Sequence, residues 1–320
     1  MSPGAEKFDV VVIGDVNPDV VMHGPDVVPE FDQHEKLVPE AAVVIGGSAS
    51  ITASACARLG LRTRVVGALG DDVFGRFMLE QLRERQVDVE LCPILPGVPT
   101  GFSVILSRGS DRAIMTYAGT IDSILLPQLP MEAILAARHV HIGSYFLQPH
   151  LAPQLPGFLG MLRAAGVTVS VDPNWDPSGA WDGGLQSLLG QVDLFFPNAA
   201  EARALTGLTG TAEAAERLAQ RAAVVALKDG DNGGLVATGT KLVRRGAYAV
   251  DCADTTGAGD AFDAGFLKGW LSNLPVEQCL AYACASGALT TRTIGATGSQ
   301  PTYEEVLALA GQTGTGHPTL

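Results

Sequence analysis

The sequence has few basic residues and no long hydrophobic run, and each shortage excludes a class of partner. Its 320 residues include 21 Lys and Arg against 34 Asp and Glu, for a formal net charge of −13. Nonspecific nucleic-acid binding needs clustered positive charge, so we expect no nucleic-acid partner. No stretch reaches the roughly 18 uninterrupted apolar residues of a membrane-spanning helix, and the N-terminus carries no signal peptide. We therefore expect no membrane partner.

Cysteine is also scarce. The five cysteines are odd in number and no CxxC motif occurs among them. This pattern favours reduced thiols in a cytoplasmic protein over a disulfide framework. His139 and His141 alternate along an expected strand without an accompanying Cys pair, so we interpret them as strand residues and not as zinc ligands.

What the chain does contain is a regular alternation of strand and helix patterns. The apolar run at 8–15 is typical of a buried parallel strand, and 48–60 carries Ile51, Ala55 and Leu59 at helical spacing. This rhythm predicts an α/β fold in which a mostly parallel sheet lies between two helix layers. Further strands are expected at 62–70, 138–142, 167–171, 192–196 and 223–228, and helices at 72–87, 131–137, 151–165, 184–190, 199–206, 211–221, 260–272, 276–291 and 302–310.

Two segments, 16–45 and 99–120, lack a helical period. They predict about four strands without crossover helices, so we expect a small separate sheet beside the carboxyl ends of the main strands. Such a sheet would act as a lid that excludes water, and the alternative is an insertion without a role in the site. Its unpaired edges favour a homodimer formed through the lid. The predicted domains are a core at 1–15, 46–98 and 121–311, the lid at 16–45 and 99–120, and a disordered tail at 312–320.

The stretch DTTGAGDAF, residues 254–262, carries the strongest chemical signal. Gly257, Ala258 and Gly259 precede a helix expected to begin at about Asp260. Their backbone N–H groups and the helix dipole would form an anion hole, and a neighbouring carboxylate could accept a proton from an attacking hydroxyl. The alternative is that Asp260 is an N-cap and the glycines form a turn.

This stretch resembles the C-terminal signature of the ribokinase-like (PfkB-type) carbohydrate kinase family. Residues 46–60 resemble the N-terminal signature, and 14–21, 70–75, 172–174 and 198–201 match further motifs in order. The resemblance covers nearly the whole chain. It implies a ribokinase-like three-layer α/β/α fold, Asp260 as catalytic base, Gly257, Ala258 and Gly259 as anion hole, and ATP with Mg²⁺.

The resemblance also implies roles for Asp19 at the sugar hydroxyls and for Asn198 and Glu201 at magnesium and phosphates. Asp19 could instead be a surface carboxylate, Glu201 a first-turn helix acid, and Lys228 either a phosphate ligand or a solvated side chain. The candidate sites are: for substrate, Asn17, Asp19, Gly46, Gly47, Ile51, Phe102 and Asp260; for the nucleotide, Asn198, Glu201, Lys228 and Gly230; and, as the resemblance implies, for a monovalent cation, K⁺, Asp254, Thr256, Thr290, Thr293, Gly295 and Ser299. Without the resemblance, Gly46 and Gly47 could be a plain turn, and 290–299 a helix end followed by a loop.

One position departs from the family pattern. Ile51 stands where ribokinase-type members have an Asn that touches the sugar, and an apolar side chain cannot bond a hydroxyl. We expect an ATP-dependent kinase acting on a primary hydroxyl of a small sugar, and the alternative is a nucleoside kinase on the same scaffold. A non-catalytic sugar-binding protein is the third possibility. A dinucleotide-dependent oxidoreductase is disfavoured because GDVNPD lacks the GxGxxG pattern.

Overall fold

The computed structural model describes residues 7–108, 111–239 and 241–312. Its main sheet has eight strands in the order β14-β13-β12-β11-β10-β9-β1-β4. The last six in this order are parallel to one another, and β13 and β14 form an antiparallel edge. The strands are β1 (Val10–Ile13), β4 (Thr63–Val66), β9 (His139–Ile142), β10 (Thr168–Val171), β11 (Leu194–Phe195), β12 (Val224–Lys228), β13 (Gly234–Thr238) and β14 (Lys241–Arg245).

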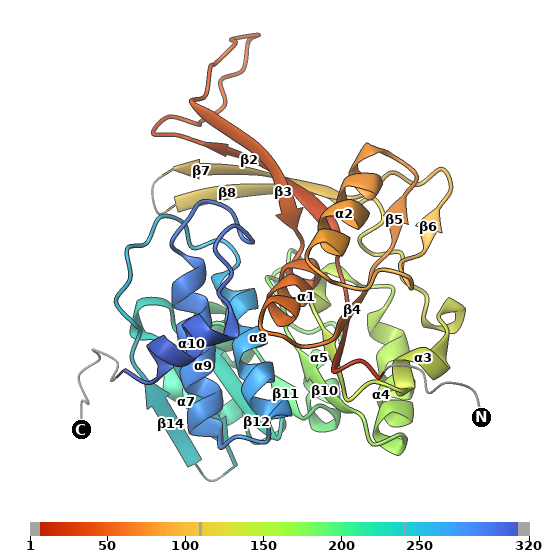
Figure 1. Ribbon diagram of the computed structural model, residues 1–320, viewed down its shortest axis with the longest axis vertical. Helices are drawn as coiled ribbons and strands as arrows, with labels where there is room; N and C mark the ends of the chain where they lie inside the picture. Colours follow the sequence, from red (N-terminus) through yellow and green to blue (C-terminus); the bar gives the residue numbers. More distant parts are fainter. Residues whose placement is uncertain (1–6, 109–110, 240, 313–320) are drawn as a thin grey trace.

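Helices cover both faces of this sheet (Figure 1). Because strand side chains alternate, Val10 and Val12 enter one hydrophobic cluster and Val11 and Ile13 the other. The first cluster contains α1 (Ser48–Arg58), α2 (Val73–Glu84), α8 (Ala258–Leu271), α9 (Val276–Thr290) and α10 (Tyr303–Ala310), and the second α3 (Met131–Leu135), α4 (Leu155–Ala164), α5 (Leu185–Leu188), α6 (Ala199–Thr206) and α7 (Thr211–Leu218). The predicted three-layer α/β fold is confirmed.

A second, four-stranded sheet has the order β3-β2-β7-β8. It is built from the two segments that lacked a helical period, so the prediction of a separate sheet is confirmed. In Figure 1 it lies across one end of the main sheet, and the connection between β2 and β3 projects from the molecule. Its strands are β2 (Asn17–His23), β3 (Glu40–Gly46), β7 (Phe102–Arg108) and β8 (Asp111–Tyr117).

Several details differ from the sequence predictions. The helix expected at 184–190 is the short α5 followed by a 3-10 turn, η4 (Leu189–Gln191), and β14 was not predicted. The pair β5 (Leu69–Gly70) and β6 (Ile94–Leu95) was also not predicted as a pair. The expected disordered tail lies outside the described residues except for Gln312. Within the described ranges, every helix is too short or too polar to cross a membrane.

Candidate active site

Polar side chains follow the carboxyl ends of five neighbouring strands. Asp15 comes just after β1, Ser144 after β9, Asp172 directly after β10 and Asn198 after β11, and Lys228 ends β12. The parallel registers bring these strand ends to the same edge of the sheet. Ligand sites of open parallel sheets form at this edge, so this is where the site is expected.

The first turn of α8 lies at this edge. The helix begins at Ala258, and its N-cap is Gly257 with a left-handed backbone (φ 76°) and no side-chain hydrogen bond to the helix end. The expectation that Asp260 starts or caps the helix is therefore wrong, because the left-handed turn at Gly257 begins the helix two residues earlier. The first N–H groups of α8 lack a side-chain acceptor from the cap, as an anion hole requires.

Asp260 is instead the third residue of α8 and carries the acidic charge of its first turn. Its carboxylate accepts a short hydrogen bond from the Ser48 hydroxyl at the start of α1. Burial, reinforced by the carboxylate of Asp172, raises the pKa of Asp260 to about 7, against a lowering contribution from Ser48. Sequence reasoning missed Ser48, although it directly follows the Gly-Gly pair of the N-terminal signature.

Asp15 fixes the position of Ser48. Its two carboxylate oxygens accept the backbone N–H groups of Ser48 at 3.0 Å and Ala49 at 2.9 Å. The N-cap of α1, Gly47, has a left-handed φ of 74°, and an added Cβ there would lie 2.8 Å from the Asn17 side-chain oxygen. The start of α1 is thus held tightly beside the start of α8.

Asn17 and Asp19 lie on the small sheet next to these helix ends. The Asn17 amide lies 3.5 Å from Asp19 Oδ1, and its own side-chain oxygen is buried without a hydrogen-bond partner among the described residues. Burial, together with the charge of Asp15, raises the pKa of Asp19 to about 7. Gly46 has no room for a side chain, since an added Cβ would overlap the Asp19 carboxylate.

The two apolar candidates lie in packed surroundings. Ile51 is 4 % exposed and belongs to the hydrophobic cluster around α1. Phe102, at the start of β7, has ring contacts with Phe74 and Tyr117 at 5.2 and 5.8 Å between centroids. Ordinary packing accounts for both, so their assignment to the substrate site stays a prediction.

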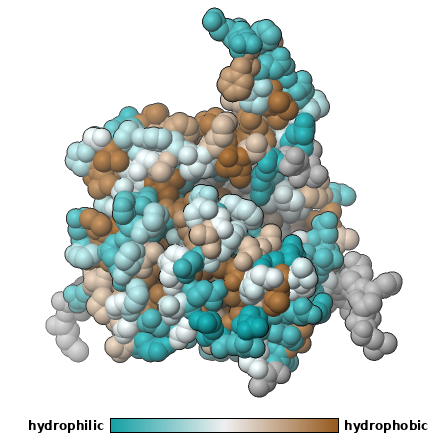
Figure 2. All heavy atoms as spheres, turned by 180° about the vertical axis from the view of Figure 1, so that it is seen from behind, coloured by the Kyte–Doolittle hydropathy of each residue, from teal (hydrophilic) through white to brown (hydrophobic). Residues whose placement is uncertain are grey.

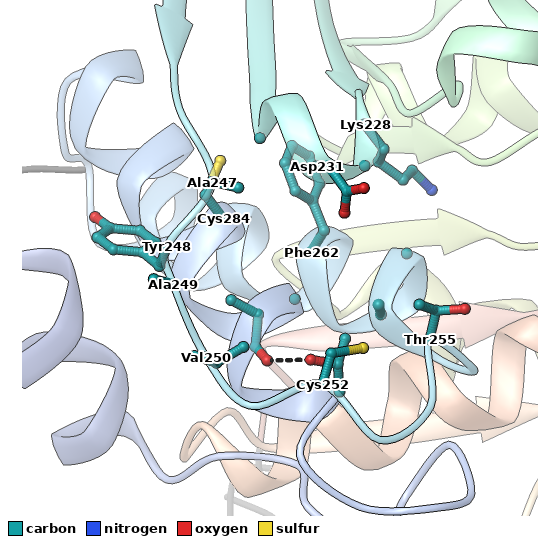
Figure 3. A pocket seen from close by; sticks show the side chains of 17 residues that line it. Lys228, Asp231, Ala247, Tyr248, Ala249, Val250, Cys252, Thr255, Phe262 and Cys284 are labelled. Carbon is teal, nitrogen blue, oxygen red and sulfur yellow. Dashed lines mark hydrogen bonds between the residues drawn. The ribbon is translucent and has the colours of Figure 1, made fainter. Parts of the chain in front are cut away.

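A cavity lies beside the N-terminus of α8 (Figure 3). Gly230 and Gly259 line it together with apolar side chains, and the stem of Lys228 contributes to its wall. Figure 3 shows the Lys228 ammonium turned away from Asp231, Phe262 and Tyr248. The remaining lining residues are Gly233, Ala247, Ala249, Val250, Cys252, Thr255, Ala258, Cys284, Gly287, Ala288 and Thr291.

Asn198 and Glu201 form a capping box at the start of α6. The Asn198 side chain accepts from Glu201 N at 2.9 Å, and Glu201 Oε2 accepts from Asn198 N at 2.8 Å. Burial, reinforced by the charge of Asp172, raises the pKa of Glu201 to about 7. The motif recognised in the sequence therefore also has a structural role, which the alternative interpretation of Glu201 as a first-turn acid had anticipated.

The six candidate cation residues come from the loop before α8, the last residue of α9 and the loop after it, which the fold brings together. Asp254 accepts from Thr256 N at 2.9 Å and from Gly295 N at 2.9 Å, which joins the loops on either side of α8 and α9. Ser299 donates to Thr290 O at 2.6 Å. Thr293 lies close by, since an added Cβ on Gly298 would be 3.0 Å from its hydroxyl. Among the described residues, no cluster of three or more His, Cys, Asp or Glu could hold a metal ion.

Comparison with known proteins shows the family of the chain. The model of the pfkB family of carbohydrate kinases matches residues 7–303. An ATP-dependent ribose-1-phosphate kinase of Halopiger xanaduensis is 33% identical over 301 residues, covering 93% of this chain and 97% of that protein. A 2-dehydro-3-deoxygluconokinase of Bacillus subtilis is 30% identical over 277 residues, covering 82% and 85%.

The fold has a solved counterpart as well. The ribokinase of Arabidopsis thaliana, solved with ribose and ATP, superposes with a TM-score of 0.80 at 23% identity, covering 96% of this chain and 99% of that chain. The predicted ribokinase-like fold and the family resemblance are both confirmed. The chain belongs to the pfkB family of carbohydrate kinases, phosphotransferases with a hydroxyl acceptor.

Proposed function

We propose that this protein transfers the γ-phosphoryl group of ATP to a primary hydroxyl of a small carbohydrate, with Asp260 as the base. The observation that supports this most directly is the pairing of an ionisable carboxylate, Asp260, with the N–H groups of the same helix turn behind Gly257. Phosphoryl transfer needs alignment, stabilisation of developing charge and a proton acceptor, and this one turn supplies the last two.

Each step of the proposed mechanism is assigned to residues of the chain. Asp19 and Asn17 bind acceptor hydroxyls, and Gly46 and Gly47 allow the acceptor to approach the backbone. Asp260, oriented by Ser48, takes the proton from the attacking hydroxyl. The N–H groups of Gly257, Ala258 and Gly259 stabilise the negative charge that develops on the transferred group.

ATP fits the cavity beside α8. Its wall is largely apolar, as a nucleobase requires, and Gly230 and Gly259 leave room for a close approach of the backbone. Asn198 and Glu201 would lie toward the phosphates and hold the accompanying Mg²⁺ together with them. When bound, Mg²⁺ neutralises charge on the phosphate oxygens.

A monovalent cation, K⁺, would be held by the two loops that Asp254 joins. Hydroxyl and carbonyl oxygens of Thr256, Thr290, Thr293, Gly295 and Ser299 are the hard ligands that such an ion prefers. Because Gly257 follows directly after this loop, the cation would stabilise the turn that forms the anion hole.

The five free cysteines also support the expectation of a cytoplasmic protein.

The four-stranded sheet would act as the lid of this site, with the core comprising 1–15, 46–98 and 121–311. Arg112 on β8 contacts the loop that precedes α8, where it donates to the Thr256 hydroxyl at 3.0 Å. The face of the sheet that carries Arg112 also carries Asp19, two strands away in the sheet order, so this face is turned toward the proposed reaction.

The opposite face of the lid would form a homodimer interface. Figure 2 shows apolar side chains gathered at the base of the projecting connection. By strand alternation most side chains of this face are apolar, with Arg108 at the end of β7 as an exception, and Val43 and Met115 on it are 44% and 57% exposed. Its other members are Val20, Met22, Val104 and Leu106.

Met115→Lys is therefore expected to shift the protein from dimer to monomer, because a charge on this face loses hydration on association. Light scattering at micromolar concentration measures the mass. Met161→Lys, at a methionine on α4 that is also exposed (45%), is the matched control and keeps the wild-type mass. A wild-type protein that is already monomeric contradicts the lid dimer.

The acceptor itself is decided by a screen of ATP consumption. Neutral sugars, phosphorylated sugars, sugar acids and the nucleosides adenosine, inosine and cytidine are compared, each with and without K⁺. Turnover of a carbohydrate supports the proposal, and turnover restricted to nucleosides establishes the alternative on the same scaffold. Tight sugar binding without ATP consumption on any acceptor would support the non-catalytic alternative.

The activity is expected to rise with pH through a midpoint near 7. Asp260 must be ionised to accept a proton, and its pKa is about 7, so kcat/KM falls as the pH drops below that value. Ser48→Ala removes a hydrogen bond that stabilises the carboxylate, so its midpoint moves upward. The measurement is kcat/KM against pH for both proteins, with folding checked at each pH. Coincident midpoints in the two proteins would contradict the role given to Ser48.

A further inference from the structure

Lys228 is enclosed by carboxylates at the edge of the site. Its side chain is 13% exposed, and its Nζ lies 2.5 Å from Asp172 Oδ2 and 3.0 Å from Asp263 Oδ2. These two partners are themselves 6% and 0% exposed. The ammonium is therefore held by two buried carboxylates and not by solvent.

The three residues belong to three different elements. Lys228 ends β12, Asp172 directly follows β10, and Asp263 lies in α8 one turn after Asp260. The Lys228 stem passes beneath the first turn of α8, since an added Cβ on Gly259 would be 3.4 Å from its Cδ. The ammonium thus joins the helix that carries the base to the carboxyl end of the sheet.

Carboxylates outnumber this ammonium in its surroundings. Four of them interact electrostatically with Lys228: Asp172, Glu201, Asp260 and Asp263. Burial alone would raise the pKa of Asp172, but Lys228 outweighs this effect and lowers it. Burial would likewise lower the pKa of Lys228, and the carboxylates outweigh this effect and raise it. Lys228 and Asp172 are therefore a fully charged buried pair.

Asp263 differs from its neighbours in its hydrogen bonding. One of its oxygens accepts from Lys228, and the other is buried without a partner among the described residues. A buried carboxylate in this state is stable only while a cation stays beside it or a proton is taken up. The position of α8 is thus sensitive to the charge at position 228.

We propose that Lys228 is a positioning residue whose ammonium fixes the first turns of α8, and with them Asp260 and the Gly257–Gly259 turn, against the carboxyl end of β10. This inference rests on the proposed role of Asp260 as base. It differs from the expectation that the ammonium binds nucleotide phosphate, because that group is engaged by Asp172 and Asp263 and faces away from Asp231 and Phe262 (Figure 3).

The two roles predict different kinetics. Lys228→Met keeps the length of the side chain and removes its charge. If Lys228 positions α8, kcat falls roughly a hundredfold, as expected for a misplaced catalytic group, while KM for ATP stays close to the wild-type value. If Lys228 binds phosphate, KM for ATP rises instead.

A second variant removes both charges of the Lys228–Asp172 pair. In Lys228→Met/Asp172→Asn the tightest ion pair is absent, and the amide at position 172 can still accept from Asn174 N and donate to Asp263. We expect this double variant to recover most of the kcat lost in the single one. The unpaired charge of Asp172 is gone, and Asp263, whose pKa is raised well above its ordinary value by burial, can take up a proton. Lys241→Met is the control, since Lys241 pairs with Glu277 on the surface and touches none of these groups.

The outcomes separate clearly. Loss of kcat in Lys228→Met and its recovery in the double variant support the proposal. A raised KM for ATP with kcat retained, or a double variant no more active than the single one, overturns it. If the single variant fails to fold, a folded and active double variant supports the proposal and an unfolded one overturns it. Failure of the proposed function is recognised separately, because Asp260→Asn would then turn over at the wild-type rate.

Discussion

Asp260→Asn is expected to lower kcat roughly a thousandfold, the full contribution of a general base. An amide has the volume of the carboxylate and can still accept the Ser48 hydrogen bond, so the first turn of α8 should keep its geometry. It cannot take up the proton of the acceptor hydroxyl at neutral pH. ATP binding should persist, because the cavity beside α8 is lined without this side chain.

The measurement is steady-state phosphorylation of the acceptor identified in the screen, with ATP affinity determined by calorimetry. Asp71→Asn is the matched control. Asp71 is an exposed carboxylate that precedes α2 and pairs with Arg76 in that helix. It should leave both quantities unchanged. Turnover by Asp260→Asn at the wild-type rate would remove Asp260 from the mechanism.

Gly257→Ala is expected to reduce both stability and kcat. Position 257 has a left-handed φ of 76°, which costs a residue with a Cβ about 1–2 kcal/mol. The added Cβ would also lie 2.7 Å from Ala296 Cβ and 2.8 Å from Ala296 O, so one of the two loops has to move. A displaced N–H group in an anion hole lowers kcat roughly a hundredfold.

Gly259→Ala separates backbone strain from the presence of a methyl group in the same turn. Gly259 lies inside α8 with helical geometry, and its added Cβ would be 3.4 Å from the flexible Lys228 stem. Its thermal unfolding should therefore stay near that of the wild type. Equal melting temperatures for wild type and Gly257→Ala would contradict the strain argument. An unchanged kcat in Gly257→Ala would contradict the role of this turn as an anion hole.

Much of the fold could be predicted from local patterns. A buried strand gives a continuous apolar run such as 8–15, and a helix with one buried face gives an apolar period such as that of Ile51, Ala55 and Leu59. Both patterns can be recognised in the sequence without the structure. The separate small sheet followed from the missing crossover helices. The start of α8 was misplaced by two residues, because an isolated Gly can continue a turn or cap a helix and only its backbone angle distinguishes the two.

The candidate residues of the site could be named one by one from the sequence, but their contacts could not. Asp260, Glu201 and Asp19 were proposed because the family motifs contain them. Ser48 and Asp263 were missed, although Asp263 stands three residues after Asp260 and so projects from a similar side of the helix. Their importance comes from partners more than 30 residues away in the chain, and no spacing rule reports such contacts.

The sequence by itself determined the family and the α/β architecture and indicated the turn that we propose to react, because these depend on short-range patterns and on motifs with fixed spacing. Only the tertiary structure decided which charged and polar groups lie next to one another in the site. It placed one ammonium, Lys228, between the end of β10 and α8, and it set the Ser48 hydroxyl against Asp260. The physical reason is that burial and Coulomb interactions act through space, so the charge state of a carboxylate depends on neighbours that the chain order does not reveal.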